Sequence, residues 1–208
     1  MKSTPGKGSL IAFCGIDGCG KTTQLKLAEK WLLDRGHEVL ATRQPSDFYR
    51  KHPAVRNFFR TNVAEGGMES LVMLSALDRQ FHLRTVIEPA LAAGTIVLCD
   101  RYYYSAEAFF FARGINPEFV RQHNPGIPKP TLTVFLDIPA RVCHERIHSR
   151  DGKWSSVEEQ DLAFLEKVRL GFEGAADETF LRIDGLECIE TIHKTIVSSV
   201  AASLQKSY

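Results

Sequence analysis

The chain has 208 residues, which is enough for one well-buried domain and too few for two of ordinary size, so we expect a single domain over residues 1–208. Its 26 basic and 25 acidic residues nearly balance, and 44% of the residues are hydrophobic. This composition is typical of a globular protein and excludes the strongly basic surface that binds nucleic-acid polymers. Basic groups that bind a small anion must therefore be gathered around one cleft.

The five cysteines are scattered, without a C-x-x-C pair or a histidine at metal-ligand spacing. They predict neither a disulfide framework nor a zinc site, and we expect a reducing, cytoplasmic location. Cys14 and Cys99 lie inside apolar runs, where a free cysteine usually packs as a small hydrophobe. The first nine residues resemble no targeting peptide, and no apolar run reaches membrane-spanning length, so we expect no membrane association.

Five short apolar runs predict five β-strands, at residues 9–14, 37–42, 95–99, 131–136 and 180–183. Helical spacing of apolar residues follows the first run and ends at Gly36, and a long helical segment is expected over residues 68–93. Residues 116–130 are rich in proline and glycine and predict a surface loop. Because parallel strands need crossover connections, this order predicts an α/β fold of three layers, with a five-stranded parallel sheet flanked by helices.

Residues 15–22 read GIDGCGKT, which matches the P-loop pattern G-x-x-x-x-G-K-[ST] between a predicted strand and a predicted helix. Glycines let consecutive backbone N–H groups turn toward a phosphate, and Lys21 brings a charge to the β- and γ-phosphates. A glycine-rich turn with an exposed lysine is the alternative interpretation. The motif predicts the P-loop NTPase fold and an ATP site formed by Gly15, Ile16, Asp17, Gly18, Cys19, Gly20, Lys21, Thr22 and Thr23.

A Mg²⁺ site is expected beside the P-loop. Thr22 offers a hydroxyl to the ion, and Asp100, which ends the apolar run of residues 95–99, offers a carboxylate from a neighbouring strand. A helix cap after a strand is the alternative role for Asp100. With ATP as the phosphoryl donor, Mg²⁺ is therefore the predicted cofactor.

Other motifs decide between classes of P-loop protein. The guanine-reading N-K-x-D motif of GTPases is absent, and the short chain suits a nucleoside or nucleotide kinase. The sequence resembles the thymidylate kinase family across nearly its whole length. The resemblance rests on five stretches in family order, namely FCGIDGCGKTTQ at residues 13–24, RQP at 43–45, ALDR at 76–79, DRYYYSAEA at 100–108 and FLEKVRLGF at 164–172.

The resemblance implies roles for individual residues. Arg101 and Arg43 hold the phosphate of the acceptor from two sides, and Asp17 holds the 3′-hydroxyl of its sugar. Arg79 hydrogen-bonds the base edge, although a surface arginine is the alternative there, and Ser105 faces the pyrimidine ring. The acceptor site is thus predicted to contain Asp17, Arg43, Ser75, Arg79, Arg101, Ser105 and Phe109.

Residues 141–155 resemble the family's lid over ATP. Some family members carry an arginine in the P-loop that stabilises the transition state, but here that position is Gly18, so the charge must come from the lid. Arg146 and Arg150, four residues apart on one helix face, and Lys153 are the candidates. A solvated basic helix face is the alternative interpretation. The predicted catalytic residues are Lys21, Asp17, Arg101, Arg146 and Arg150.

The sequence departs from the family pattern in three places. Cys14 replaces an acid before the P-loop, Ser75 replaces the aromatic residue that stacks on thymine, and Phe109 and Phe110 stand where the family has Tyr-Gln. Stacking on the base from position 75 is then absent, or an aromatic ring from elsewhere in the chain provides it. The candidates for supplying it are Phe48, Phe81 and Tyr104.

The leading hypothesis is transfer of the γ-phosphate of ATP to dTMP, giving dTDP. One alternative is a kinase of the same fold that acts on another nucleotide or nucleotide-like acceptor. Another is a non-catalytic ATP-binding protein, which the retained Asp17, Lys21, Thr22, Asp100 and Arg101 disfavour. The expected partners are small-molecule nucleotides, and the resemblance also implies a homodimer.

Overall fold

The computed structural model describes residues 8–151 and 156–205, with the backbone alone for residues 150 and 151. Its strands are β1 (Leu10–Cys14), β2 (Val39–Arg43), β3 (Ile96–Asp100), β4 (Leu132–Asp137) and β5 (Phe180–Asp184). Its helices are α1 (Lys21–Leu33), α2 (Asp47–Lys51), α3 (Pro53–Thr61), α4 (Met68–His82), the π-helical η1 (Leu83–Ile87), α5 (Glu88–Ala92), α6 (Tyr103–Ala112), α7 (Pro117–Gln122), α8 (Ala140–Asp151), the 3₁₀ turn η2 (Val157–Gln160), α9 (Leu162–Ala175) and α10 (Ile189–Gln205).

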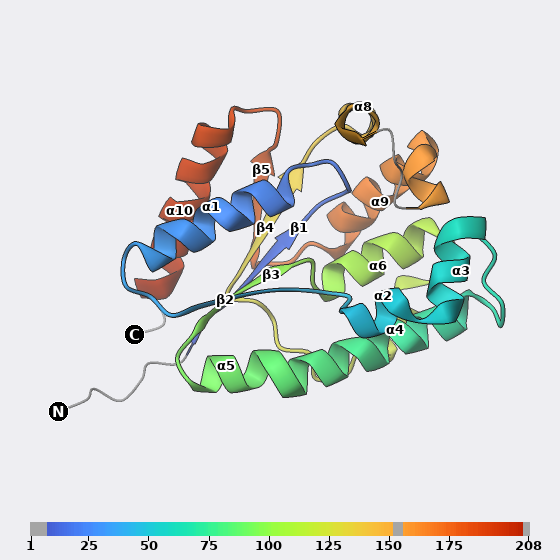
Figure 1. Cartoon of the computed structure of the whole chain (residues 1–208), viewed down its shortest axis with the longest axis horizontal. Helices are drawn as coiled ribbons and strands as arrows, with labels where there is room; N and C mark the ends of the chain where they lie inside the picture. The colour runs from blue at the N-terminus through green and yellow to red at the C-terminus, as the bar shows by residue number, and fades with distance from the viewer. Residues whose placement is uncertain (1–7, 152–155, 206–208) are drawn as a thin grey trace.

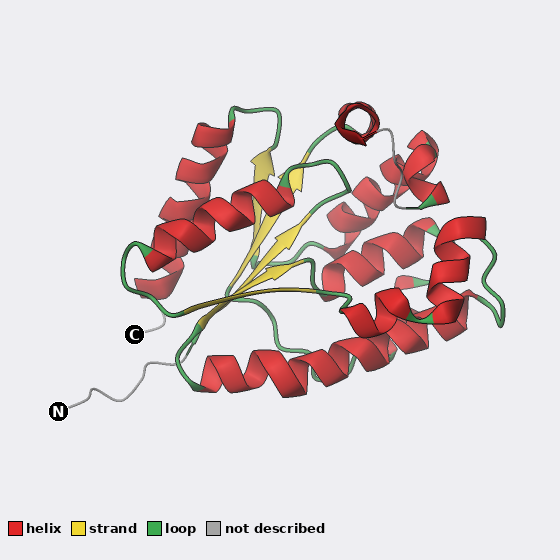
Figure 2. Cartoon of the chain, viewed as in Figure 1, coloured by secondary structure: helices red, strands yellow, loops and turns green. Residues whose placement is uncertain are grey.

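The five strands form one parallel sheet in the order β2-β3-β1-β4-β5. Helices cover both faces, with α1 and α10 on one and α4, α6 and α9 on the other (Figures 1 and 2). Strands β1, β3 and β4 are almost entirely buried, as expected for central strands of a doubly covered sheet. The predicted three-layer α/β fold is confirmed.

Strand register brings the functional ends of the strands together. Asp100, which ends β3, lies opposite Phe13 of β1 on one side and Arg43 of β2 on the other. The P-loop follows β1 directly, so the pairing alone sets Asp100 and Arg43 beside it. Ligands of open α/β sheets bind at this carboxyl edge.

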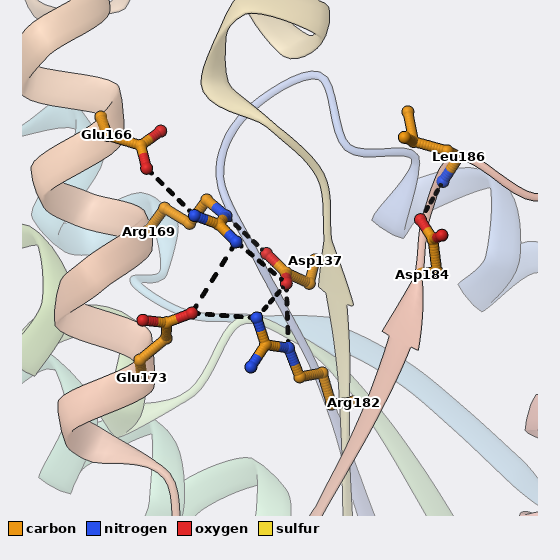
Figure 3. Close-up of polar contacts among 7 residues, drawn as sticks. All are labelled: Asp137, Glu166, Arg169, Glu173, Arg182, Asp184 and Leu186. Carbon is orange, nitrogen blue, oxygen red and sulfur yellow. Dashed lines mark hydrogen bonds and ion pairs between the residues drawn. The ribbon is translucent and has the colours of Figure 1, made fainter.

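A cluster of ion pairs fixes the end of β4, from which the chain continues into α8 (Figure 3). Arg169 of α9 donates to Asp137 from Nε at 2.7 Å, and Arg182 of β5 donates to it at 2.9 Å. Burial alone would raise the pKa of Asp137, but the hydrogen bonds from Arg169 and Arg182 outweigh burial and lower it. The cluster therefore fastens α9 to two strands at the base of α8.

The expected helical segment at residues 68–93 is present, but it is not uniform. Between α4 and α5 it passes through the π-helical turn η1, directly before Pro89. Proline has no N–H to donate, and its ring would clash with the carbonyl four residues earlier in a regular helix. Widening the preceding turn lets the helix continue past Pro89.

Two expectations need correction. The strand predicted at residues 37–42 starts and ends later than expected, so Arg43 is the last residue of β2 and does not follow it. Residues 116–130 are not all loop, because they contain α7, which Asn116 caps by accepting a hydrogen bond from the backbone N–H of Glu118. The cap followed by proline at the first helical position is a helix start that the proline content obscured. Within the described residues, no helix is long and apolar enough to cross a membrane.

Candidate active site

The P-loop wraps around the start of α1. Its Gly18 and Gly20 have φ values of 81° and 95°, in the left-handed region that favours glycine, so the loop can turn its backbone inward. Lys21 is buried, and its Nζ donates to the carbonyl oxygen of Ile16 at 2.9 Å. The lysine is thus folded back over the loop, at the positive end of a helix where anions bind.

The oxygen donors expected for Mg²⁺ lie together. The hydroxyl of Thr22 donates to Oδ2 of Asp100 at 3.1 Å across 78 residues of sequence. Among the described residues, no group of three or more His, Cys, Asp or Glu could hold a metal ion. One hydroxyl and one carboxylate nevertheless fit Mg²⁺, which keeps several waters and takes its other ligands from substrate phosphates.

A large cavity of about 640 Å³, here called the P-loop cavity, opens over the loop. The predicted ATP residues that line it are Asp17, Gly18, Cys19, Gly20, Lys21, Thr22 and Thr23. Gly15 and Ile16 are buried beneath the loop and are not among the lining residues. Asp100 and Arg146 also line this cavity, as do Gly185, Glu187 and Ile189.

A second cavity of about 180 Å³, here called the α4–α6 cavity, lies between these two helices. Six of the residues predicted to bind the acceptor line it, namely Asp17 from the P-loop, Ser75 and Arg79 from α4, Ser105 and Phe109 from α6, and Arg101. Ser105 is 5% exposed, and its hydroxyl lies beside the thiol of Cys14 at the end of β1. Arg101 stacks on the ring of Phe109, with its guanidinium carbon 4.8 Å from the ring centroid.

The two cavities meet at three charged residues. Asp17, Arg50 and Arg101 line both of them. Arg101 donates to Asp17 at 2.6 Å and to the carbonyl oxygen of Gly15 at 3.2 Å. Burial alone would raise the pKa of Asp17, but the charges of Arg101 and Lys21 outweigh it and lower the pKa to about 2. The junction is therefore ionised at neutral pH.

Backbone geometry supports the same junction. Arg101 is a non-glycine residue with φ of 68°, a conformation that costs about 1–3 kcal/mol and persists where the surroundings enforce it. Its N–H donates to the carbonyl oxygen of Phe13 in β1 at 2.8 Å. The turn after β3 thus directs the guanidinium between the two cavities.

Arg43 and Arg50 differ from the sequence expectation. Arg43 was expected opposite Arg101 around one phosphate, but it is half exposed, pairs with Asp47 and lines only the P-loop cavity. Arg50 takes the position between the cavities and donates from Nε to the carbonyl oxygen of Pro45 at 2.9 Å. Burial, and then repulsion by Arg101 and Arg43, lowers the pKa of Arg50. The signal for Arg50 was the Ser-Asp pair that caps α2 and places an arginine in its last turn.

The aromatic residues expected to replace the ring missing at Ser75 lie away from the α4–α6 cavity. Phe48 and Phe81 are exposed, Tyr104 packs edge-on against Phe180, and none of the three lines the α4–α6 cavity. The aromatic residues that do line it are Tyr49, Phe59, Tyr102, Phe109 and Phe110. Tyr49 and Phe59 come from α2 and α3, whose contacts with α4 could not be read from the chain order.

Helix α8 packs directly on the P-loop. A Cβ atom at Gly18 would lie 2.6 Å from the carbonyl oxygen of Cys143, which is closer than real Cβ contacts come. No side chain fits at Gly18 with α8 in this position. Arg146 of α8 is exposed and lines the P-loop cavity. Arg150 belongs to the same helix, but its side chain, like the whole of Lys153, lies outside the described residues.

The 3₁₀ turn η2 contributes to the lining of the α4–α6 cavity, and the sequence did not suggest it. Glu158 of η2 accepts two hydrogen bonds from Arg113, at 2.7 and 2.6 Å, and both side chains are less than 10% exposed. The guanidinium of Arg113 lies 5.0 Å from the ring centroid of Phe58 and 5.1 Å from that of Phe110. Glu158, Glu159 and Arg113 line the cavity. Seen only as sequence, Glu158 is one acid in an acidic run.

Comparison with known proteins agrees with this geometry. The sequence profile described as thymidylate kinase matches residues 13–196. The chain belongs to the thymidylate kinase family. A probable thymidylate kinase of Pyrococcus horikoshii is 36% identical over 205 residues, covering 95% of this chain and 98% of that protein. A thymidylate kinase of Desulfotalea psychrophila is 33% identical over 207 residues, and the alignment covers 99% of both chains.

The family resemblance seen in the sequence is therefore confirmed. A probable thymidylate kinase of Archaeoglobus fulgidus adds a relative that is 36% identical over 190 residues, covering 90% of this chain and 92% of that protein. The similarity extends over almost the full length of these relatives, so it includes the α4–α6 cavity as well as the P-loop.

Proposed function

We propose that the protein transfers the γ-phosphoryl group of ATP to dTMP, with ATP in the P-loop cavity and dTMP in the α4–α6 cavity. The observation that carries this proposal is the junction of the two cavities at Asp17, Arg50 and Arg101. A phosphoryl group can pass between two bound nucleotides only where their sites meet. Two arginines at that point provide the positive charge that binds and orients the transferring oxygens.

On the donor side, Lys21 and the P-loop N–H groups hold the β- and γ-phosphates. Thr22 and Asp100 would hold Mg²⁺, which would neutralise charge that develops on the phosphates. Arg146 is the described lid cation that lines this cavity, so we assign it to the transition-state charge. A role for Arg150 or Lys153 beside it remains part of the proposal.

On the acceptor side, Arg101 and Arg50 hold the monophosphate, and Arg43 contributes from the donor side. Asp17, which is ionised, accepts a hydrogen bond from the 3′-hydroxyl of the sugar. Arg79 and Ser105 read the polar edge of the base, and Phe109 packs against the nucleoside. The apolar walls of the cavity suit the thymine ring and its methyl group.

The test is an assay of ADP release with purified protein, ATP, Mg²⁺ and a panel of nucleoside monophosphates. We expect dTMP to give the highest kcat/KM, and omission of Mg²⁺ to abolish turnover. Rapid turnover of another monophosphate with dTMP inert would reject the acceptor and leave the kinase assignment standing. ATP binding without turnover of any acceptor would support the non-catalytic alternative.

We also propose a homodimer that uses the outer face of α4. Met73, Leu77 and Phe81 recur every four residues on this face and are 48%, 59% and 66% exposed. Such a stripe on one helix suits burial against a second copy. Light scattering after size exclusion should give the dimer mass for the wild type and the monomer mass for Leu77→Glu. A wild-type monomer at micromolar concentration would reject the dimer.

A cytoplasmic location completes the proposal. Five cysteines are free in the structure, and four of them are buried. Burial raises the pKa of Cys14 and of Cys143 to about 12, which keeps these thiols protonated and unreactive. Free, protected thiols fit the reducing compartment where nucleotides are made.

A further inference from the structure

The guanidinium of Arg79 is an unusual group in the α4–α6 cavity. Arg79 is 2% exposed, and among the described residues no carboxylate forms an ion pair with it. The neighbouring acid, Asp78, is engaged elsewhere, because it accepts hydrogen bonds from the backbone N–H and the hydroxyl of Ser46. Burial lowers the pKa of Arg79, although it stays a cation, since arginine does not lose its proton in proteins.

Two neutral oxygens hold this cation. Nη1 of Arg79 donates to Oδ1 of Asn124, and Nη2 donates to the hydroxyl of Ser75 at 3.3 Å. Nε has no hydrogen-bond partner among the residues that the structure describes. Arg79 therefore keeps both its full charge and unused donors for a ligand in the cavity.

Asn124 is itself held in one orientation. Its amide nitrogen donates to the carbonyl oxygen of Val120 at 2.7 Å, so its own oxygen must face Arg79. Asn124 does not line the cavity, and it follows α7 in a turn. A second bond joins the same turn to α4, because Nε2 of Gln80 donates to the carbonyl oxygen of Pro125 at 2.8 Å.

We propose that Asn124 is a positioning residue for acceptor recognition, which fixes the guanidinium of Arg79 against the base without neutralising it. A carboxylate in its place would hold Arg79 equally well but would compete for its charge. A neutral amide oxygen orients the cation and leaves its field available to a carbonyl oxygen on the base. The inference rests on the proposed function, since it assumes that Arg79 contacts the acceptor.

The test measures KM and kcat for dTMP in Asn124→Ala, with Gln80→Ala as the matched control. Both variants lose one hydrogen bond between α4 and the same turn, but only Asn124→Ala releases Arg79. We expect Asn124→Ala to raise KM about tenfold with little change in kcat, since a lost hydrogen bond to a charged group is worth that much. Gln80→Ala should leave KM within about twofold of wild type.

Rescue provides a second readout. Asn124→Asp keeps an oxygen for Arg79, so KM for dTMP should return to within about threefold of wild type. At the same time its charge should weaken discrimination against dCMP, which has an amino group where dTMP has a carbonyl. If Asn124→Ala does not fold in a thermal melt, Asn124→Ser, whose shorter side chain leaves Arg79 unheld, gives the same comparison.

An Arg79→Ala variant distinguishes a failure of the positioning role of Asn124 from a failure of the proposed acceptor contact of Arg79. If Arg79→Ala raises KM and Asn124→Ala does not, the positioning role is overturned and the acceptor site stands. Equal effects of Asn124→Ala and Gln80→Ala would show that the turn as a whole matters, which also overturns the specific role. If Arg79→Ala itself leaves KM unchanged, the proposed acceptor contact is wrong.

Discussion

The two cavities are constructed in different ways. The P-loop cavity is lined by one contiguous stretch, residues 17–24, at the start of α1, together with single residues from other parts of the chain. The α4–α6 cavity collects side chains from α2, α3, α4, α6 and η2, which lie up to 110 residues apart between Tyr49 and Glu159. The P-loop cavity therefore depends on a local structure, whereas the α4–α6 cavity exists only once the helices have packed.

This difference predicts different kinds of failure. Damage to a contiguous loop should remove chemistry and leave the fold intact, because few tertiary contacts depend on its side chains. Damage to the assembled cavity should cost stability, because its buried polar groups are each other's partners. Substitutions on the two sides test whether this contrast holds.

The largest effect is expected at the buried pair that closes the α4–α6 cavity. Glu158→Ala leaves the guanidinium of Arg113 buried without its carboxylate, which should lower the free energy of unfolding by about 3–5 kcal/mol. Urea denaturation gives the value. Arg113→Met combined with Glu158→Leu, which removes both charges, should cost clearly less than Glu158→Ala. A double variant as unstable as the single one would show that packing, not charge, holds η2.

Lys21 tests the P-loop cavity, where we expect a substitution to remove activity and leave the fold stable. Lys21→Met should lower kcat at least about a hundredfold, the scale for one preorganised group that stabilises developing charge. Its melting temperature should stay near that of the wild type. Lys26→Met, at an exposed position of the same helix, is the matched control and should keep full activity. Near-normal turnover of Lys21→Met would mean that the loop does not bind the transferring phosphate.

Gly18 tests the contact between the P-loop and α8. Gly18→Ala places a Cβ 2.6 Å from the carbonyl oxygen of Cys143, so α8 and Arg146 must shift, and we expect kcat to fall about tenfold. Gly36→Ala is the control, because Gly36 has a similar φ of 78° but no atom within 4 Å of the added Cβ. It should lose about 1 kcal/mol of stability through backbone strain and no activity. Equal kcat values in the two variants would contradict a functional lid contact.

The same contrast explains what the sequence could predict. The five strands and the P-loop were found from short runs, because burial on both faces and glycine-dependent turns leave a local signature. Asp100 was placed correctly because parallel register puts strand ends at one edge. The observed strand boundaries differ from the predicted ones by up to two residues. This difference places Arg43 at the end of β2, whereas the predicted strand ended before it.

The residues around the α4–α6 cavity were harder to predict from the sequence, and the reason is physical. Arg50, Arg113, Asn124 and Glu158 are ordinary surface residues in the sequence, and only packing buries them or joins them to partners far along the chain. Family resemblance identified Arg79 and Ser105, but it could not show which rings surround them. Exposure then excluded Phe48 and Phe81 as substitutes for a stacking ring.

The smallest effect is expected at His82, which links the two regions. It is the last residue of α4 and contacts the end of β2, with Nε2 2.8 Å from the hydroxyl of Thr42 and Nδ1 3.2 Å from the amide nitrogen of Gln44. The amide of Gln44 donates to Nδ1, so the ring is neutral when both contacts form.

Burial lowers the pKa of His82, and the opposing charge of Asp78 does not outweigh burial. Below the usual histidine pKa of about 6.5, the unfolded chain therefore binds a proton at His82 that the folded protein does not bind as readily. The stability that His82 contributes is complete above that pH and declines as the pH falls.

His82→Gln removes this titration. Urea denaturation at about pH 7.5 and about pH 5.5 should show that acidification lowers the free energy of unfolding less in the variant than in the wild type. His193, whose pKa is also lowered by burial, is present in both proteins, so the difference between the two losses isolates His82. Equal losses would mean that the link between β2 and α4 does not depend on a neutral ring.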